Sequence, residues 1–164
     1  PLALANPTDY TCRANIMWAG TLAHNDLTGC GTTGDWATHN IEHELSGLFD
    51  VSHGAGLAAV WGSWARYTRN ENLPRFARFA HNVMGIDTTN MSDMEASETG
   101  IKAMEQFFRS IGMPTDIHTL VGKDITDAEI EEMAQKCTNG DTTTIGGLKI
   151  LHAADIVKIY QMAK

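Results

Sequence analysis

Three histidines lie within a fifteen-residue stretch of the chain. His39 and His43 are four residues apart, so on a helix both side chains project from the same face. His53 follows after a break in the helical pattern at residues 49–52, which lets the next helix fold back on the first. Neutral imidazole is a common nitrogen ligand of zinc, iron and nickel. The spacing therefore favours half of a metal site shared by two consecutive helices.

Two glycines, Gly54 and Gly56, follow His53 directly. Because they carry no side chain, they allow another backbone or a cofactor to come close. Free N–H groups at the start of a helix also favour a nearby phosphate or carboxylate. A helical histidine is nevertheless more often a surface or hydrogen-bonded core residue than a ligand, and spacing alone fixes no coordination geometry. On spacing alone, the histidines can be either metal ligands or ordinary surface and core residues.

One metal interpretation takes residues 39–43, H-N-I-E-H, as the H-x-x-E-H pattern of inverted zincins. His39 and His43 would then bind zinc, and Glu42 would act as general base in peptide hydrolysis by a metal-activated water. The pattern has only three fixed positions, and it leaves His53 with its following glycines unexplained. We keep a small zinc metallopeptidase as an alternative.

The longer pattern His39-x3-His43-x9-His53-Gly-x-Gly-Leu-Ala resembles the metal-binding signature of the iron-containing (group III) alcohol dehydrogenases. Residues 13–25, R-A-N-I-M-W-A-G-T-L-A-H-N, and residues 34–39, G-D-W-A-T-H, are similar to the branch that contains the NAD(P)H-dependent butanol dehydrogenases. The resemblance extends over nearly the whole chain.

The resemblance implies a role for each histidine. Family members hold one divalent metal through one Asp and three His, and the last two of these histidines match His39 and His53. The residue that matches His43 is not a ligand; it faces the nicotinamide and the substrate, so we expect His43 to relay a proton or to position the substrate. Glu42 then forms a structural hydrogen bond or ion pair. The implied reaction interconverts primary alcohols and aldehydes by hydride transfer with NAD(P)(H), with Fe²⁺ as the expected metal and Zn²⁺ as the alternative.

The chain also departs from the family pattern. The family's other two ligands form an Asp-x3-His pair on an upstream helix, but no such pair precedes Asp35; Asp9, for example, is followed four residues later by Arg13. The family's G-G-G-S pyrophosphate loop is missing as well, and the chain opens at Pro1 without a methionine. We therefore expect the C-terminal helical domain with the N-terminal nucleotide-binding domain absent, and no dehydrogenase activity from this chain alone. A catalytically silent helical domain is a third interpretation.

Helical periodicity and capping signals predict an all-α fold and a single domain over residues 1–164. The family resemblance implies that this domain is the C-terminal one of the dehydroquinate-synthase-like fold of iron-dependent alcohol dehydrogenases. Capping boxes at 92–95 and 126–129 mark two helix starts. In the first helix, Met17 and Trp18 belong to the face that we expect to be buried. The expected helices number about seven, at residues 9–24, 35–48, 53–68, 71–84, 93–111, 127–136 and 153–162.

Composition limits the partners of the chain. Its 164 residues are enough for one domain with its own core. Its 12 Lys and Arg against 20 Asp and Glu give a net charge of −8, which argues against nucleic acid. No apolar run approaches the roughly 20 residues that span a bilayer. The three cysteines include no C-x-x-C pair, which favours a reducing compartment, and we expect a cytoplasmic protein that acts on small alcohols or aldehydes as a homo-oligomer.

Overall fold

Nine α-helices and two short 3₁₀ turns account for the ordered secondary structure, and the computed structural model describes all 164 residues. The all-α class is confirmed, since the β pairing consists of one isolated bridge between Ile145 and Leu151. No helix is both long and apolar enough to cross a membrane. The helices are α1 (Leu2–Ala5), α2 (Tyr10–His24), α3 (Ala37–Phe49), α4 (His53–Thr68), α5 (Leu73–Asn82), α6 (Asp93–Ser110), α7 (Ile117–Val121), α8 (Asp127–Cys137) and α9 (Ala153–Ala163).

All seven helices expected from the sequence are present, and both capping boxes form, with Ser92 and Thr126 as the N-caps of α6 and α8. The prediction missed α1 and α7, which have only four and five residues and are too short to show a helical period. α7 did carry local signals: the Asp116 side chain accepts a hydrogen bond from the backbone of Thr119, and Gly122 ends the helix in the left-handed region at φ 77°.

The chain divides into two compact units, Pro1–Gly34 and Asp35–Lys164. The single domain that the sequence predicts over residues 1–164 therefore stays a prediction. The first unit contains α1 and α2 and has no buried residue of its own. Met17 and Trp18 are 70% and 63% exposed, so the prediction of a buried face on this helix is wrong within the unit.

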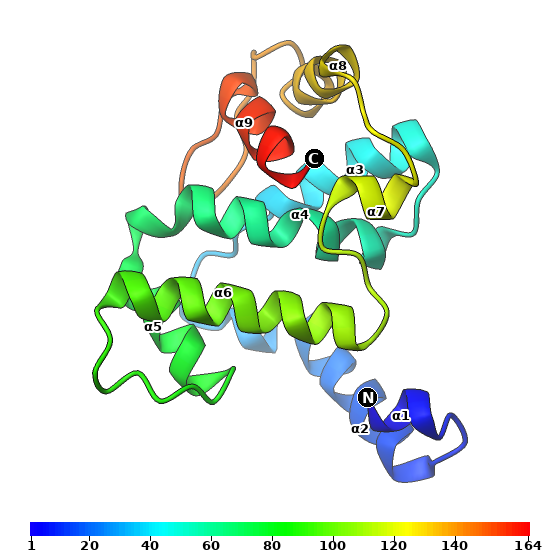
Figure 1. Cartoon of the computed structure of the whole chain (residues 1–164), viewed down its shortest axis with the longest axis vertical. Coiled ribbons are helices and arrows are strands. Elements are labelled where there is room, and N and C mark those ends of the chain that lie inside the picture. Colours follow the sequence, from blue (N-terminus) through cyan, green and yellow to red (C-terminus); the bar gives the residue numbers. More distant parts are fainter. The chain divides into compact units, whose positions relative to one another are not determined.

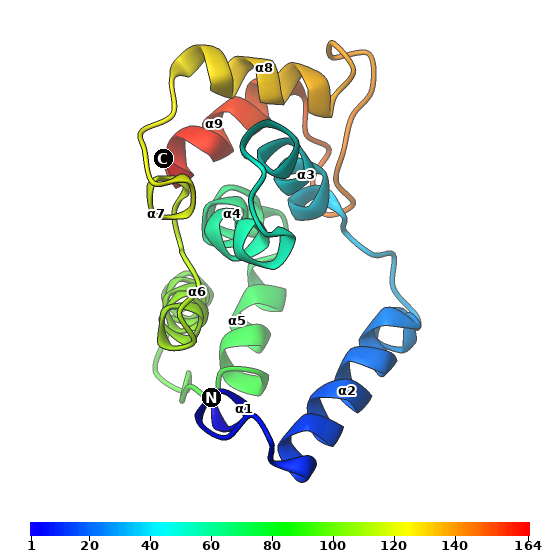
Figure 2. The same ribbon diagram turned by 90° about the vertical axis from the view of Figure 1, so that its right-hand side faces the viewer.

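The second unit is organised around α4, which packs against α3, α9, α6 and α7 (Figures 1 and 2). α3, α8 and α9 lie on one side of α4, and α5 and α6 lie on the other side. Small residues let the helices approach closely. A Cβ at Gly62 of α4 would lie within 3.0 Å of the Glu105 carboxyl carbon of α6, and one at Gly100 of α6 would lie 2.7 Å from the Ala80 Cβ of α5.

Two long-range contacts fix α3, the helix that carries His39 and His43. The buried Tyr160 hydroxyl of α9 donates to the Ile41 carbonyl at 2.6 Å. Just before α3, the Asp35 carboxylate accepts hydrogen bonds from the backbone of Ala37 at 2.8 Å and, through its other oxygen, from Leu148 at 2.7 Å. These contacts restrict rotation and sliding of α3, so they position its histidines.

Candidate metal centre

The three histidines meet at the junction between α3 and α4. α3 ends at Phe49 and is followed by its C-cap Asp50, which adopts the left-handed conformation at φ 53°, and His53 is the first residue of α4. The ring centroid of His53 lies 5.4 Å from that of His39 and 5.3 Å from that of His43, whereas the two rings on α3 are 6.4 Å apart. The turn between the helices therefore brings His53 to both histidines of α3.

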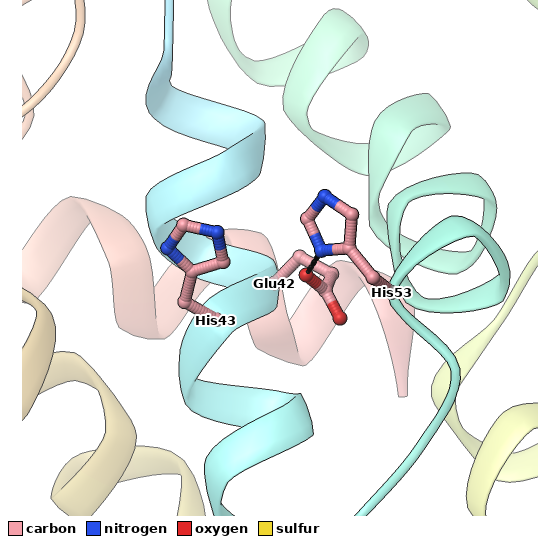
Figure 3. A group of neighbouring side chains, drawn as sticks. All are labelled: Glu42, His43 and His53. Atoms are coloured by element: carbon pink, nitrogen blue, oxygen red, sulfur yellow. Dashed lines mark hydrogen bonds and ion pairs between the residues drawn. The ribbon is translucent and has the colours of Figure 1, made fainter.

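The side chain of Glu42 is fully buried, and its carboxylate points toward the His53 ring (Figure 3). One of its carboxylate oxygens contacts Nδ1 of His53, and the other accepts a hydrogen bond from the Ser46 hydroxyl one turn along α3. Gly56 of α4 makes room for this carboxylate, since a Cβ there would lie 2.5 Å from Oε1 of Glu42. The expected structural hydrogen bond or ion pair of Glu42 is therefore present.

His39 is partly buried, and its Nδ1 has no hydrogen-bond partner. Burial lowers the pKa of His39, and the neighbouring rings of His53 and His43 lower it further. Both effects favour the neutral imidazole, the form that binds metals. Trp36 packs edge-on against this ring at a centroid distance of 4.8 Å and is itself 64% exposed.

The residues present fit part of a metal site. A metal bound about 2.1 Å from an imidazole nitrogen lies about 3 Å from the ring centre, so two rings on a tetrahedral metal have centroids about 5 Å apart. The pair His39–His53 at 5.4 Å and the pair His43–His53 at 5.3 Å both meet this requirement. Among the three rings, only that of His39 has a buried nitrogen, Nδ1, that lacks a hydrogen-bond partner. Catalytic metal sites use at least three protein ligands, so two imidazoles make an incomplete set.

A second donor group overlaps the first. One possible ligand atom each of Glu42, His43 and His53 lies within 4.8 Å of the other two. His43 and His53 are exposed, while the carboxylate of Glu42 is buried and in contact with Ser46 and His53. His53 belongs both to this group and to the pair with His39. If His39 is the second imidazole on the metal, His43 stays free for proton transfer; if His43 is, His39 stays free.

The inverted-zincin arrangement is not favoured by this geometry. Its general base must reach a water on the metal, but both oxygens of Glu42 already have protein partners and the side chain has no exposed surface. The two histidines of that motif, His39 and His43, are also the most widely separated pair of the three.

Some roles at this site differ from the sequence interpretation. Gly56 accommodates the Glu42 side chain rather than a backbone or a cofactor, whereas the Cβ position of Gly54 faces open space. The hydrogen bond from Ser46 was not anticipated. Its position four residues after Glu42 is the signal for it, because such pairs are neighbours on a helix.

Comparisons with known proteins place the whole chain in one family. The Fe-containing alcohol dehydrogenase family, C-terminal part, matches residues 1–164. This chain belongs to that family. It is 36% identical over 162 residues to NADH-dependent butanol dehydrogenase A of Clostridium acetobutylicum, covering 98% of this chain and 40% of that protein. It is also 36% identical over 160 residues to the NADPH-dependent aldehyde reductase YqhD of Escherichia coli, covering 94% and 41% respectively.

Solved structures of the family share the fold. The NADH-dependent butanol dehydrogenase A of Thermotoga maritima superposes with a TM-score of 0.87 at 30% identity, over 98% of this chain and 41% of that one. The E. coli YqhD structure gives a TM-score of 0.90 at 32% identity, over 100% and 41%. The chain thus spans about 40% of the length of these relatives and corresponds to the C-terminal part of the family fold.

Proposed function

We propose that this chain supplies two ligands, His39 and His53, to the divalent metal of an NAD(P)-dependent alcohol dehydrogenase, and His43 to its proton transfer. The observation that carries the proposal is the meeting of the three imidazoles where α3 turns into α4. Membership of the iron-containing family supports Fe²⁺ as the metal, with Zn²⁺ as the alternative. The remaining ligands and the nucleotide site would come from outside these 164 residues.

Burial separates the proposed roles of the two histidines on α3. His39 is held in its neutral form by its surroundings and presents an unpartnered nitrogen, which suits a ligand. His43 is exposed, so an imidazole nitrogen there can take a proton from the substrate hydroxyl and pass it to water. The metal, when bound, supplies Lewis acidity toward the alcohol or aldehyde oxygen, and the nicotinamide exchanges the hydride with the carbon.

Primary alcohols and aldehydes are the proposed substrates. The support comes from the names of the relatives, which are butanol dehydrogenases in Clostridium and an aldehyde reductase in E. coli. The relatives include both NADH- and NADPH-dependent proteins, so the proposal covers NAD(P)(H) as a class. The homo-oligomer and the cytoplasmic location expected from the sequence stay predictions.

A chimera tests the proposal. The matched C-terminal segment of the Clostridium butanol dehydrogenase is replaced by this chain, and metal content and butanol-dependent NAD⁺ reduction are measured. We expect an active, metal-loaded enzyme, while the 164-residue chain alone is inactive. His53→Ala should lose the metal and the activity together. His43→Ala should keep the metal and lose about 10²- to 10⁴-fold in rate, the usual contribution of proton transfer by a side chain.

Four results would contradict the proposal. Hydride transfer by the isolated chain would show that its catalytic site is complete. Full activity of a folded His53→Ala chimera would remove this residue from the site. Metal loss in His43→Ala, with His39→Ala neutral, would assign the metal to the other donor group. A folded chimera that binds metal normally but is inactive would favour the catalytically silent domain.

A further inference from the structure

We propose that Glu42 is the positioning residue of the metal centre, because it sets the tautomer and the orientation of the His53 imidazole. The inference rests on the proposed function, in which His53 is a metal ligand. Glu42 lies on α3 and His53 begins α4, and the carboxylate of the former contacts Nδ1 of the latter (Figure 3). A carboxylate is an acceptor only, so this contact requires the proton of the neutral ring to be on Nδ1.

The position of the proton determines what Nε2, the other nitrogen of the His53 ring, can do. With the proton on Nδ1, the lone pair of Nε2 is free to bind a metal. A histidine ligand that donates its second N–H to a carboxylate is held in one orientation and becomes a stronger donor. His53 is 49% exposed and lies at the first position of α4, and its one side-chain hydrogen bond is the one with Glu42. Glu42 therefore provides most of the order that a ligand needs.

The surroundings of Glu42 indicate a dedicated position. Its side chain has no exposed surface, and a buried carboxylate is costly unless hydrogen bonds satisfy it. Ser46 and His53 occupy one oxygen each. Gly56 leaves the space on α4 that the carboxylate fills. The carboxylate of Glu42, the hydroxyl of Ser46 that holds it and the space at Gly56 thus come together beside Nδ1 of His53.

The same contacts argue against Glu42 as a ligand. The oxygen nearest to His53 faces Nδ1, so a metal on Nε2 lies on the opposite side of the ring from it. The other oxygen faces Ser46 within α3. In the group of Glu42, His43 and His53, we therefore describe His53 as the ligand, Glu42 as the carboxylate that positions it, and His43 as an imidazole that binds no metal.

Nuclear magnetic resonance of the ¹⁵N-labelled 164-residue chain, without metal, tests the tautomer directly. We expect the Nδ1–H form for His53 in the wild type and in Glu42→Gln, whose amide oxygen still accepts a hydrogen bond. Glu42→Ala should shift His53 toward the Nε2–H form. Gly56→Ala should cause the same shift with Glu42 still present, since the new Cβ would displace the carboxylate.

Zn²⁺ affinity, measured by competition with a chelator, gives the second readout. We expect Glu42→Ala to weaken binding about 10- to 100-fold, and Glu42→Gln to weaken it less. Leu45→Ala is the matched control, because Leu45 is as fully buried on α3 as Glu42 and its apolar side chain cannot form a hydrogen bond with His53. It should lower stability while leaving the tautomer and the affinity unchanged.

A wild-type His53 in the Nε2–H form would overturn the inference, and so would a folded Glu42→Ala chain that binds Zn²⁺ as tightly as the wild type. A change of tautomer in Leu45→Ala would overturn it too, because general loosening would then be the cause. Zn²⁺ binding by the wild type that bypasses His53 contradicts the proposed function instead, while a tautomer set by Glu42 would still be confirmed in the metal-free chain.

Discussion

The two units of this chain differ in how far their apolar side chains are buried. In Asp35–Lys164, fifteen buried residues form one continuous cluster that includes Ile41, Leu45 and Tyr160. In Pro1–Gly34, no residue is buried, and Tyr10 is 84% exposed. Both units are helical and both carry large apolar side chains, so composition does not explain the difference.

The explanation is the number of helices that can reach one another. α2 has fifteen residues, but its companion α1 has only four and cannot cover an apolar face. α4 has sixteen residues and is flanked by helices on both sides (Figure 2). Since helix stability in proteins comes mainly from the packing of an apolar face, the histidines of the metal centre lie in the unit that can hold them rigidly.

The largest expected effect is in the second unit. Leu45→Ala removes a fully buried side chain from the main core, and we expect the free energy of unfolding to fall by about 2–5 kcal/mol. Urea denaturation followed by far-ultraviolet circular dichroism measures this change. A loss below about 0.5 kcal/mol would mean that the packing around α3 is not as tight as the structure indicates.

The smallest expected effect is in the first unit. Trp18→Ala removes a larger side chain than Leu45→Ala does, yet Trp18 is 63% exposed, and the unfolding free energy should change by no more than about 0.5 kcal/mol. The same denaturation experiment applies. A loss above about 1 kcal/mol that depends on protein concentration would show that a second copy covers α2 in solution, and would break the contrast between the units.

The sequence predicted the long helices well because their signals are local. Ser92 and Thr126 define two helix starts through side-chain bonds that span only three residues, and both are formed. The prediction missed α1 and α7 because four or five residues are too few to show a helical period of apolar residues. The exposed face around Trp18 was mispredicted for another reason: an apolar pattern indicates which side could be buried, not whether another element covers it.

In the candidate metal centre, too, the features with a local sequence signal could be predicted and the long-range contacts could not. The gathering of His39, His43 and His53 followed from their spacing and from the family resemblance, whereas their roles stay proposals. The contact between Glu42 and His53 joins residues eleven apart on two helices, so it depends on how α3 and α4 cross. The link from Asp35 to Leu148 spans 113 residues and has no local signal at all.

The most direct test of the account is a Zn²⁺ titration of the ¹⁵N-labelled chain in which each histidine side chain is followed separately. We predict that the resonances of His39 and His53 shift together with added metal, while those of His43 and the four other histidines do not follow the same curve. Joint shifts of His43 and His53, with His39 unchanged, would contradict the account.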